Sequence, residues 1–230
     1  MKFRKLALCA AAATVAMGGI ALAQGAGPTV AYNVGATSDY SFRGRTRTAK
    51  NPAVFGGVDV SSGMAYAGAW TSNVDWGIET DLYAGVKPAL GPVSFDLGVV
   101  YYGYPDSDVK NAAYWEGKMA ASIAAGTGTL GLVYYYSPEF FGKTGKADYY
   151  ELNGSVPLGK ATLSGAIGRQ SLAKSSYGIT GYSTMNAGVT VPIFGPVTAD
   201  LRYIYTDDDA KITCVGCSLN KVVATIKASF

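Results

Sequence analysis

Segments of about ten residues in which apolar and polar side chains alternate recur along most of this chain. In residues 93–101 every odd position is apolar: Val93, Phe95, Leu97, Val99 and Tyr101. Successive side chains of a β-strand point to opposite faces, so the pattern predicts strands with one apolar and one polar face. About ten residues is also the length that a tilted strand needs to cross a bilayer.

Twelve such segments are expected as strands, near residues 29–42, 53–61, 64–75, 79–87, 93–103, 114–124, 129–137, 147–157, 161–170, 182–191, 197–206 and 220–230. Between them, short turns that carry Gly or Pro alternate with longer polar loops, as tight hairpins require. An even strand number with this alternation predicts an all-β fold, an antiparallel up-and-down transmembrane β-barrel. Both chain ends then lie on the short-turn side.

The last segment, Asn220–Phe230, places Lys221 and Lys227 on its polar face and Phe230 on its apolar face. It resembles the terminal strand of bacterial outer-membrane β-barrels, whose C-terminal Phe belongs to the signal that the barrel-assembly machinery recognises. The resemblance implies that Phe230 is an assembly signal. We expect this strand to pair with residues 29–42 and close the sheet without edges.

The N-terminus carries three basic residues in Met1–Lys5, then an apolar stretch to Leu22 and the motif Ala21-Leu22-Ala23. This pattern predicts a secretory signal peptide over residues 1–23 and a barrel over residues 24–230. A retained transmembrane anchor is less favoured, because the apolar run is short and ends in a cleavage motif. Without the signal, 19 − 3 = 16 basic residues face 16 acidic ones, so no basic excess supports a nucleic-acid partner.

Aromatic residues gather at the predicted loop-side ends of the strands. They are Tyr101, Tyr102, Tyr104, Tyr114, Trp115, Tyr134, Tyr135, Tyr136, Tyr149, Tyr150, Tyr203 and Tyr205. Amphipathic rings at one level favour a membrane-interface girdle. The general preference of strands for Tyr is the alternative.

The chain has no histidine, which excludes a Ser-His-Asp triad and a His-ligated zinc site. Catalysis by a carboxylate pair is less favoured than a structural role, since acidic residues are expected in a wet lumen. We therefore predict no enzyme activity, no cofactor and no metal.

Position parity places charged residues on the polar face, where they would line a pore. The candidates are Asp39, Arg43, Asp59, Asp75, Asp81, Asp96, Glu116, Lys118, Glu151, Asp200, Arg202 and Lys227, with Glu79, Lys87 and Lys221 on the same face. Nine acids against six bases indicate a weak cation preference. The alternative is that most of them pair across strands and hold the barrel together.

Cys214 and Cys217 form a C-x-x-C spacing in the last predicted loop, after Asp207-Asp208-Asp209. A thioredoxin-like role needs a βαβ setting that this pattern lacks, and no second pair completes a zinc site. In an exported protein, a disulfide that tightens the loop is the default expectation.

A specific resemblance covers Ser38–Gly44, Asn51–Asp59, Tyr66–Asp75 and Asp81–Gly85. Together these stretches look like the opening hairpins of the TorF family of porin-like proteins, small proteobacterial outer-membrane barrels. The resemblance implies an outer-membrane pore and extends in layout to the C-terminus. The cysteine pair is not part of it.

The sequence thus predicts a passive outer-membrane channel for small polar solutes or ions, in contact with outer-membrane lipid and assembled by the barrel-assembly machinery. A non-conducting barrel with a structural or adhesive role is the first alternative. A soluble periplasmic lipocalin-like barrel, with its apolar face inside, is the second. The pattern predicts no particular oligomeric state.

Overall fold

Strands make up nearly all of the regular structure in the computed structural model, which describes residues 27–173, 180–207 and 220–230. The long strands are β1 (Thr29–Thr37), β4 (Ala53–Ser62), β5 (Ala65–Val74), β6 (Gly77–Val86), β8 (Val93–Gly103), β9 (Tyr114–Ala125), β10 (Gly128–Ser137), β11 (Ala147–Leu158), β12 (Ala161–Leu172), β13 (Gly181–Phe194), β14 (Val197–Thr206) and β15 (Asn220–Ser229). The short elements are β2 (Ser41–Phe42), β3 (Arg45–Thr46), β7 (Ala89–Leu90) and the 3-10 helix η1 (Phe141–Lys143). Within these described ranges, the twelve long strands confirm the predicted number. The predicted signal peptide lies outside the described residues.

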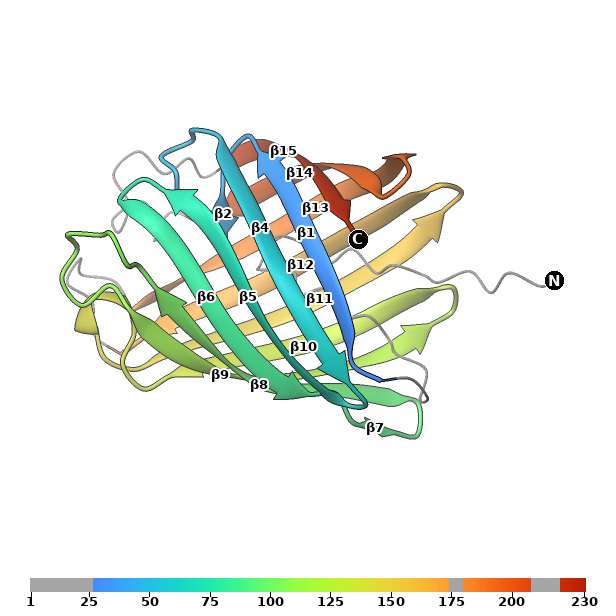
Figure 1. Cartoon of the computed structure of the whole chain (residues 1–230), viewed down its shortest axis with the longest axis horizontal. Helices are drawn as coiled ribbons and strands as arrows, with labels where there is room; N and C mark the ends of the chain where they lie inside the picture. The colour runs from blue at the N-terminus through green and yellow to red at the C-terminus, as the bar shows by residue number, and fades with distance from the viewer. Residues whose placement is uncertain (1–26, 174–179, 208–219) are drawn as a thin grey trace.

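The sheet closes on itself through its first and last strands (Figure 1). β1 pairs antiparallel with β4 on one side and with β15 on the other, in a register that joins Asn33 to Ser229 and Thr37 to Thr225. Phe230 extends this pairing through two backbone hydrogen bonds with Tyr32, of 3.0 and 2.9 Å. β6 pairs with β8, so β7 is only a short addition at the edge of a turn. The predicted closure by the last strand is confirmed.

The two ends of the barrel differ in their connections (Figure 1). β1 begins and β15 ends at the turn side, where the connections contain positive-φ glycines such as Gly63, Gly126, Gly159 and Gly195. The longer connections lie at the opposite end, which we call the loop side. The connection between β5 and β6 is the short exception at that end, at residues 75–76.

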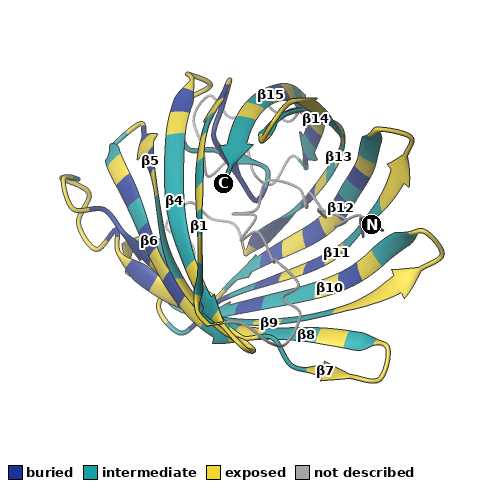
Figure 2. Cartoon of the chain, turned by 45° about the vertical axis from the view of Figure 1, so that its right-hand side comes forward, coloured by how far each residue is buried: buried dark blue, intermediate teal, exposed yellow. Residues whose placement is uncertain are grey.

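The outer wall of the barrel is apolar. More exposed and more buried residues alternate along much of the long strands (Figure 2), and the exposed residues include many large hydrophobic side chains. Leu132, Leu152, Ile167 and Leu201 are each more than half exposed, on four different strands. Large contiguous apolar surfaces mark contact with another molecule or with a membrane, so this wall is unsuited to face water. In the described part of the chain, none of the helical segments has the length and apolar character of a membrane-spanning helix.

The prediction of one strand over residues 29–42 is wrong. β1 ends at Thr37, and the chain then turns into the barrel as the hairpin β2–β3, which forms a separate two-stranded sheet. Arg43 and Gly44 are the two central residues of its turn, with φ of 47° and 80°. Two consecutive positive φ values are typical of the tight hairpin turn that follows strand twist. The polar-apolar alternation of residues 38–42 therefore belongs to a hairpin inside the barrel instead of the wall.

Candidate functional site

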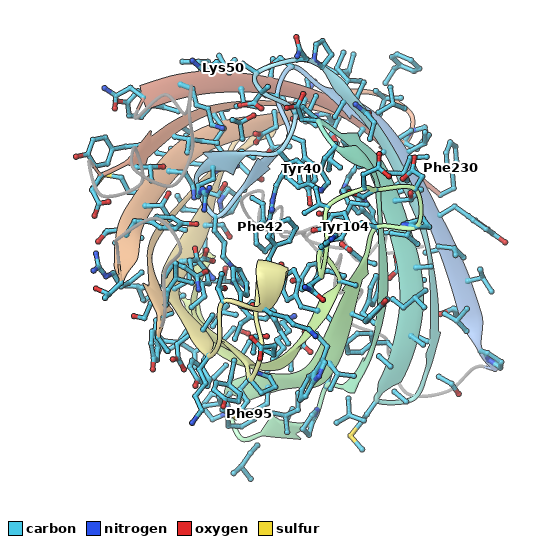
Figure 3. All side chains as sticks on the ribbon, turned by 90° about the vertical axis from the view of Figure 1, so that its left-hand side faces the viewer. Tyr40, Phe42, Lys50, Phe95, Tyr104 and Phe230 are labelled. Carbon is cyan, nitrogen blue, oxygen red and sulfur yellow. The ribbon has the colours of Figure 1, made fainter. Side chains whose placement is uncertain are left out.

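The lumen of the barrel is the candidate functional site, and its loop-side half is filled. We call residues 38–48, which include the hairpin β2–β3, the plug. Looking into the loop-side end, Figure 3 shows Tyr40 and Phe42 of the plug together with Tyr104 inside the ring of strands. The side chains of all three are at most 8% exposed. The plug therefore occupies the middle of the lumen at this end.

Aromatic rings from the wall and loops pack around the plug. Phe42 meets Tyr102 edge-on with ring centroids 5.7 Å apart, and Tyr102 stacks on Tyr114 at 4.6 Å. Phe140, just before η1, packs on Tyr114 at 4.7 Å. Tyr40 meets Trp70 at 5.4 Å. This half of the lumen is consequently a hydrophobic core built inside the barrel, and each aromatic pair adds about 0.5–1.5 kcal/mol beyond burial.

Arg43 at the tip of the plug makes the strongest polar contact with the wall. Its Nη1 and Nη2 donate to the two carboxylate oxygens of Glu116 on β9, at 3.0 and 2.5 Å. Nη1 also donates to Gln170 Oε1 on β12 at 2.9 Å. The guanidinium carbon also lies over the rings of Tyr149 and Tyr135, at 4.3 and 4.8 Å from their centroids. Both charged side chains are only 1% exposed, so this is a buried, bidentate pair.

Burial by itself disfavours the charged form of Arg43, but the Glu116 carboxylate raises the pKa of the guanidinium above its ordinary value. The plug tip therefore stays cationic and paired. Such a pair is costly to break from one side, because the remaining charge is left buried without a partner.

Other contacts hold the plug around the barrel circumference. Asp39 forms an ion pair with Lys221 of β15 at 2.6 Å. The hydroxyl of Thr206 on β14 donates to the carbonyl of Gly44 at 3.0 Å. A Cβ on Gly44 would collide with the hydroxyls of Thr184 and Thr206, so the hairpin tip needs glycine both for its φ and for this close approach.

Two neighbouring carboxylates of β6 lie beside the plug and differ in their partners. Glu79 accepts hydrogen bonds from the hydroxyls of Tyr40 and of Tyr104, the latter at 2.6 Å. Asp81 is 0% exposed, and among the described residues neither of its carboxylate oxygens has a hydrogen-bond partner. Burial, followed by the negative charges of Glu79 and Asp81, raises the pKa of Tyr40 well above its ordinary value. Tyr40 therefore keeps its proton and remains a donor to Glu79.

The turn-side half of the lumen is polar and partly exposed. Lys118 Nζ lies 2.7 Å from Asp96, and Tyr66 donates to the same carboxylate at 2.6 Å. The Lys118 and Asp96 side chains are 10% and 18% exposed, in contrast to the 1% of the Arg43–Glu116 pair. Asp59 accepts a hydrogen bond from Tyr83 at 2.7 Å. This half offers half-buried charges instead of a packed core.

Most of the charged residues predicted from the sequence lie on inward-facing positions of the strands. Asp59, Asp81, Asp96, Glu116, Lys118, Glu151, Asp200, Arg202 and Lys227 are buried or half-buried there, and Asp39 and Arg43 belong to the plug. Asp75 is exposed in the connection after β5, at the rim, so the expectation that it lies along the lumen wall is wrong.

The inward charges are extensively paired. Arg202 pairs with Asp200 at 2.9 Å and donates to Asn186 and Ser164 at 2.8 and 2.9 Å. Glu151 accepts from Tyr149 at 2.8 Å and from Asn153 at 3.0 Å. These contacts agree with the alternative that lumen charges pair with one another and hold the barrel together.

Sequence reasoning assigned all loop-side aromatics to one outer girdle, and this is only half right. Tyr101, Trp115, Tyr150 and Tyr203 are exposed on the outer wall, whereas Tyr102, Tyr104, Tyr114, Tyr135 and Tyr149 are buried inside. The alternation of faces along a strand could have separated the inner from the outer rings. Tyr114 and Tyr149 lie two residues before Glu116 and Glu151, so each shares the inward face with that glutamate. Gln170 and Arg47 were also missed, because nothing in a single sequence connects them to the plug.

Cys214 and Cys217 lie outside the described residues, so the expected disulfide stays a prediction. Within residues 27–173, 180–207 and 220–230, no group of three or more Cys, Asp or Glu side chains is arranged to hold a metal ion.

Solved structures with a similar fold are porins. The NanC porin superposes with a TM-score of 0.61 at 13% identity, over 86% of this chain and 98% of that chain. The KdgM porin superposes with a TM-score of 0.58 at 8% identity, over 87% and 98%. At these identities the likeness shows a porin-like barrel fold. No curated protein matches the chain.

A family model described as "Bacterial protein of unknown function (Gcw_chp)" matches residues 22–230. The family match does not support the TorF name that the sequence resemblance gave. The porin-like barrel that the same resemblance implies is confirmed.

Proposed function

Because the chain belongs to the Gcw_chp family of bacterial proteins and folds as a porin-like barrel, we propose that it is an outer-membrane channel for small polar solutes or ions. The observation that carries the proposal is the distribution of its side chains. A closed antiparallel sheet turns large apolar side chains outward and charged, hydrogen-bonded side chains inward. Only closed barrels and helices can satisfy their backbone groups in a bilayer, so this arrangement suits a membrane.

In this proposal the polypeptide acts by holding a polar path open through lipid, without a chemical reaction. The half-buried pair Lys118–Asp96 and the carboxylate of Asp59 would meet the solute in the turn-side half. The weak cation preference expected from nine acids and six bases is offset by Arg45 and Arg47 of the plug, which that count did not include. We therefore propose little selectivity by charge sign and a limit set by width.

Export by the predicted signal peptide and insertion by the barrel-assembly machinery would bring the protein to the outer membrane. Phe230 is 68% exposed on the outer wall, where a recognition residue is accessible. We expect Phe230→Asp to lower the amount of folded protein in the outer membrane without changing the conductance of the molecules that do insert. Normal membrane levels of this variant would contradict an assembly role.

A second candidate function is a non-conducting barrel with a structural or adhesive role. The filled loop-side half favours it, because Tyr102, Tyr114 and Phe42 belong to a packed hydrophobic cluster inside the barrel. The soluble lipocalin-like alternative needs its apolar face inside, and the exposed apolar wall argues against it.

Planar-bilayer recording of the purified, refolded protein tests the proposal. We expect discrete conductance steps, and a reversal potential near zero under a salt gradient. The control is a heat-denatured sample, and boiled and unboiled gel migration verifies that the tested protein is folded. Folded protein that inserts into lipid but passes no current would favour the non-conducting barrel.

A further inference from the structure

We propose that the plug is a gate, which the Arg43–Glu116 pair holds in the lumen and which the partnerless carboxylate of Asp81 tends to release. The inference rests on the proposed channel function, since a gate needs a path to close. It concerns the regulation of the same lumen.

The backbone of the plug is independent of the barrel wall. β2 and β3 pair with each other in their own sheet, so the plug can leave without breaking a ladder of the barrel. Its backbone is joined to the wall near its two ends, where Ser38 donates to the carbonyl of Ala224 at 2.8 Å and Asp75 donates to that of Arg47 at 2.7 Å. These two points are the natural hinges, and the segment between them is held by side chains.

The holding contact is the buried pair at the tip. Arg43 uses both Nη atoms on Glu116, and a third hydrogen bond reaches Gln170. Both charges are nearly inaccessible to water, so each depends on the other while the plug is in place. Neutralising Glu116 alone leaves the Arg43 cation buried without a carboxylate, a state that leaving the lumen relieves.

The opposing contribution comes from Asp81. Its carboxylate is completely buried beside the plug and has no hydrogen-bond partner in the described part of the chain. Burying a carboxylate without partners is unfavourable, and departure of the plug would expose it to water. Asp81→Leu puts an apolar side chain of similar branched shape in this place, which removes the buried polar atoms and should keep the plug in place.

The two neutral variants therefore shift the same equilibrium in opposite directions. Glu116→Gln is expected to raise the open-to-closed ratio by about tenfold or more, and Asp81→Leu is expected to lower it, since tenfold corresponds to only about 1.4 kcal/mol. A purely structural role for both residues predicts the same direction of change for both variants. Asp148→Asn, which changes a carboxylate that accepts a hydrogen bond from Tyr134, is the control and should leave the ratio unchanged.

Two readouts test the gate. The first is the open probability in single-channel recordings. The second readout does not depend on current and uses Ser41, a plug residue that is 3% exposed. A variant with Ser41→Cys, Cys214→Ser and Cys217→Ser carries one thiol in the plug. The rate at which a water-soluble maleimide labels this thiol is measured. Both should rise in Glu116→Gln and fall in Asp81→Leu. If Glu116→Gln does not fold, Arg43→Gln with Glu116→Gln replaces it, since this double variant removes both charges of the pair and should also raise the open-to-closed ratio.

The outcomes separate the gate from the channel. Equal open probability and labelling in wild type and both variants, or shifts in the same direction, would overturn the gate and leave the channel intact. Labelling that changes as expected in folded protein that never conducts would overturn the channel and, with it, the gate.

Discussion

The two halves of the lumen carry the same kinds of residue in different surroundings. In the loop-side half, the pair Arg43–Glu116 is 1% exposed and enclosed by rings, whereas in the turn-side half the pair Lys118–Asp96 is 10% and 18% exposed. The partners of an ion pair depend on each other more strongly the less water reaches them, so this dependence should be greater for Arg43–Glu116 than for Lys118–Asp96. The comparison teaches that one half is packed like a protein core, whereas the other holds partly buried charges that suit the path of the proposed channel. Stability and closure should depend on the first, and ion passage on the second.

The largest expected difference concerns aromatic truncation. Tyr114 stacks on Tyr102 and is only 3% exposed. Tyr114→Ala should lower the free energy of unfolding by about 3–5 kcal/mol, because removing a core ring leaves a cavity. Tyr66→Ala in the turn-side half should cost clearly less, since Tyr66 is only partly buried. Urea unfolding from lipid vesicles, followed by tryptophan fluorescence, measures both. Equal losses would break the distinction between core and path.

A smaller effect is expected at the plug tip. Gly44→Ala should destabilise the folded protein by about 1–2 kcal/mol, because the φ of 80° is unfavourable for a residue with a Cβ. The added Cβ would also press on Thr184 and Thr206. Gly159→Ala is the control, with a φ of 62° and nothing within 4 Å of the added Cβ. Both variants carry the same kind of backbone strain. If Ser41→Cys is labelled faster in Gly44→Ala but not in Gly159→Ala, the effect comes from the contact of the plug tip with Thr184 and Thr206. Equal labelling would show that the tip does not rely on this close approach.

The smallest effect should appear in ion selectivity. Asp96→Asn removes the charge that pairs with Lys118 in the turn-side half and should shift the reversal potential towards anions. Its cost in stability should be smaller than that of breaking the more deeply buried Arg43–Glu116 pair. Glu151→Gln, in the buried region near Tyr149, is the comparison and should leave the reversal potential unchanged. A shift in Glu151→Gln larger than that in Asp96→Asn would place the ion path in the wrong half.

The barrel could be predicted from the sequence because alternation and turn chemistry are local. The twelve strands, their connections and the closure by Asn220–Phe230 follow from side-chain parity and from Gly and Pro at turns. Lumen-facing positions such as Asp96 and Glu116 follow from the same parity. The plug could not be found in this way, because residues 38–42 alternate like a strand whether they extend the wall or fold inward. Its position depends on contacts with Glu116 and Gln170, which are 73 and 127 residues from Arg43 in the chain.

The central claim is that the barrel holds a polar path which the plug closes. The most direct test replaces residues 39–47 with a Gly/Ser linker of equal length and compares single-channel currents with those of the wild type. We predict steady, open conductance from the linker variant and intermittent or smaller currents from the wild type. A linker variant that is folded and inserted in the bilayer but passes no current would contradict the claim.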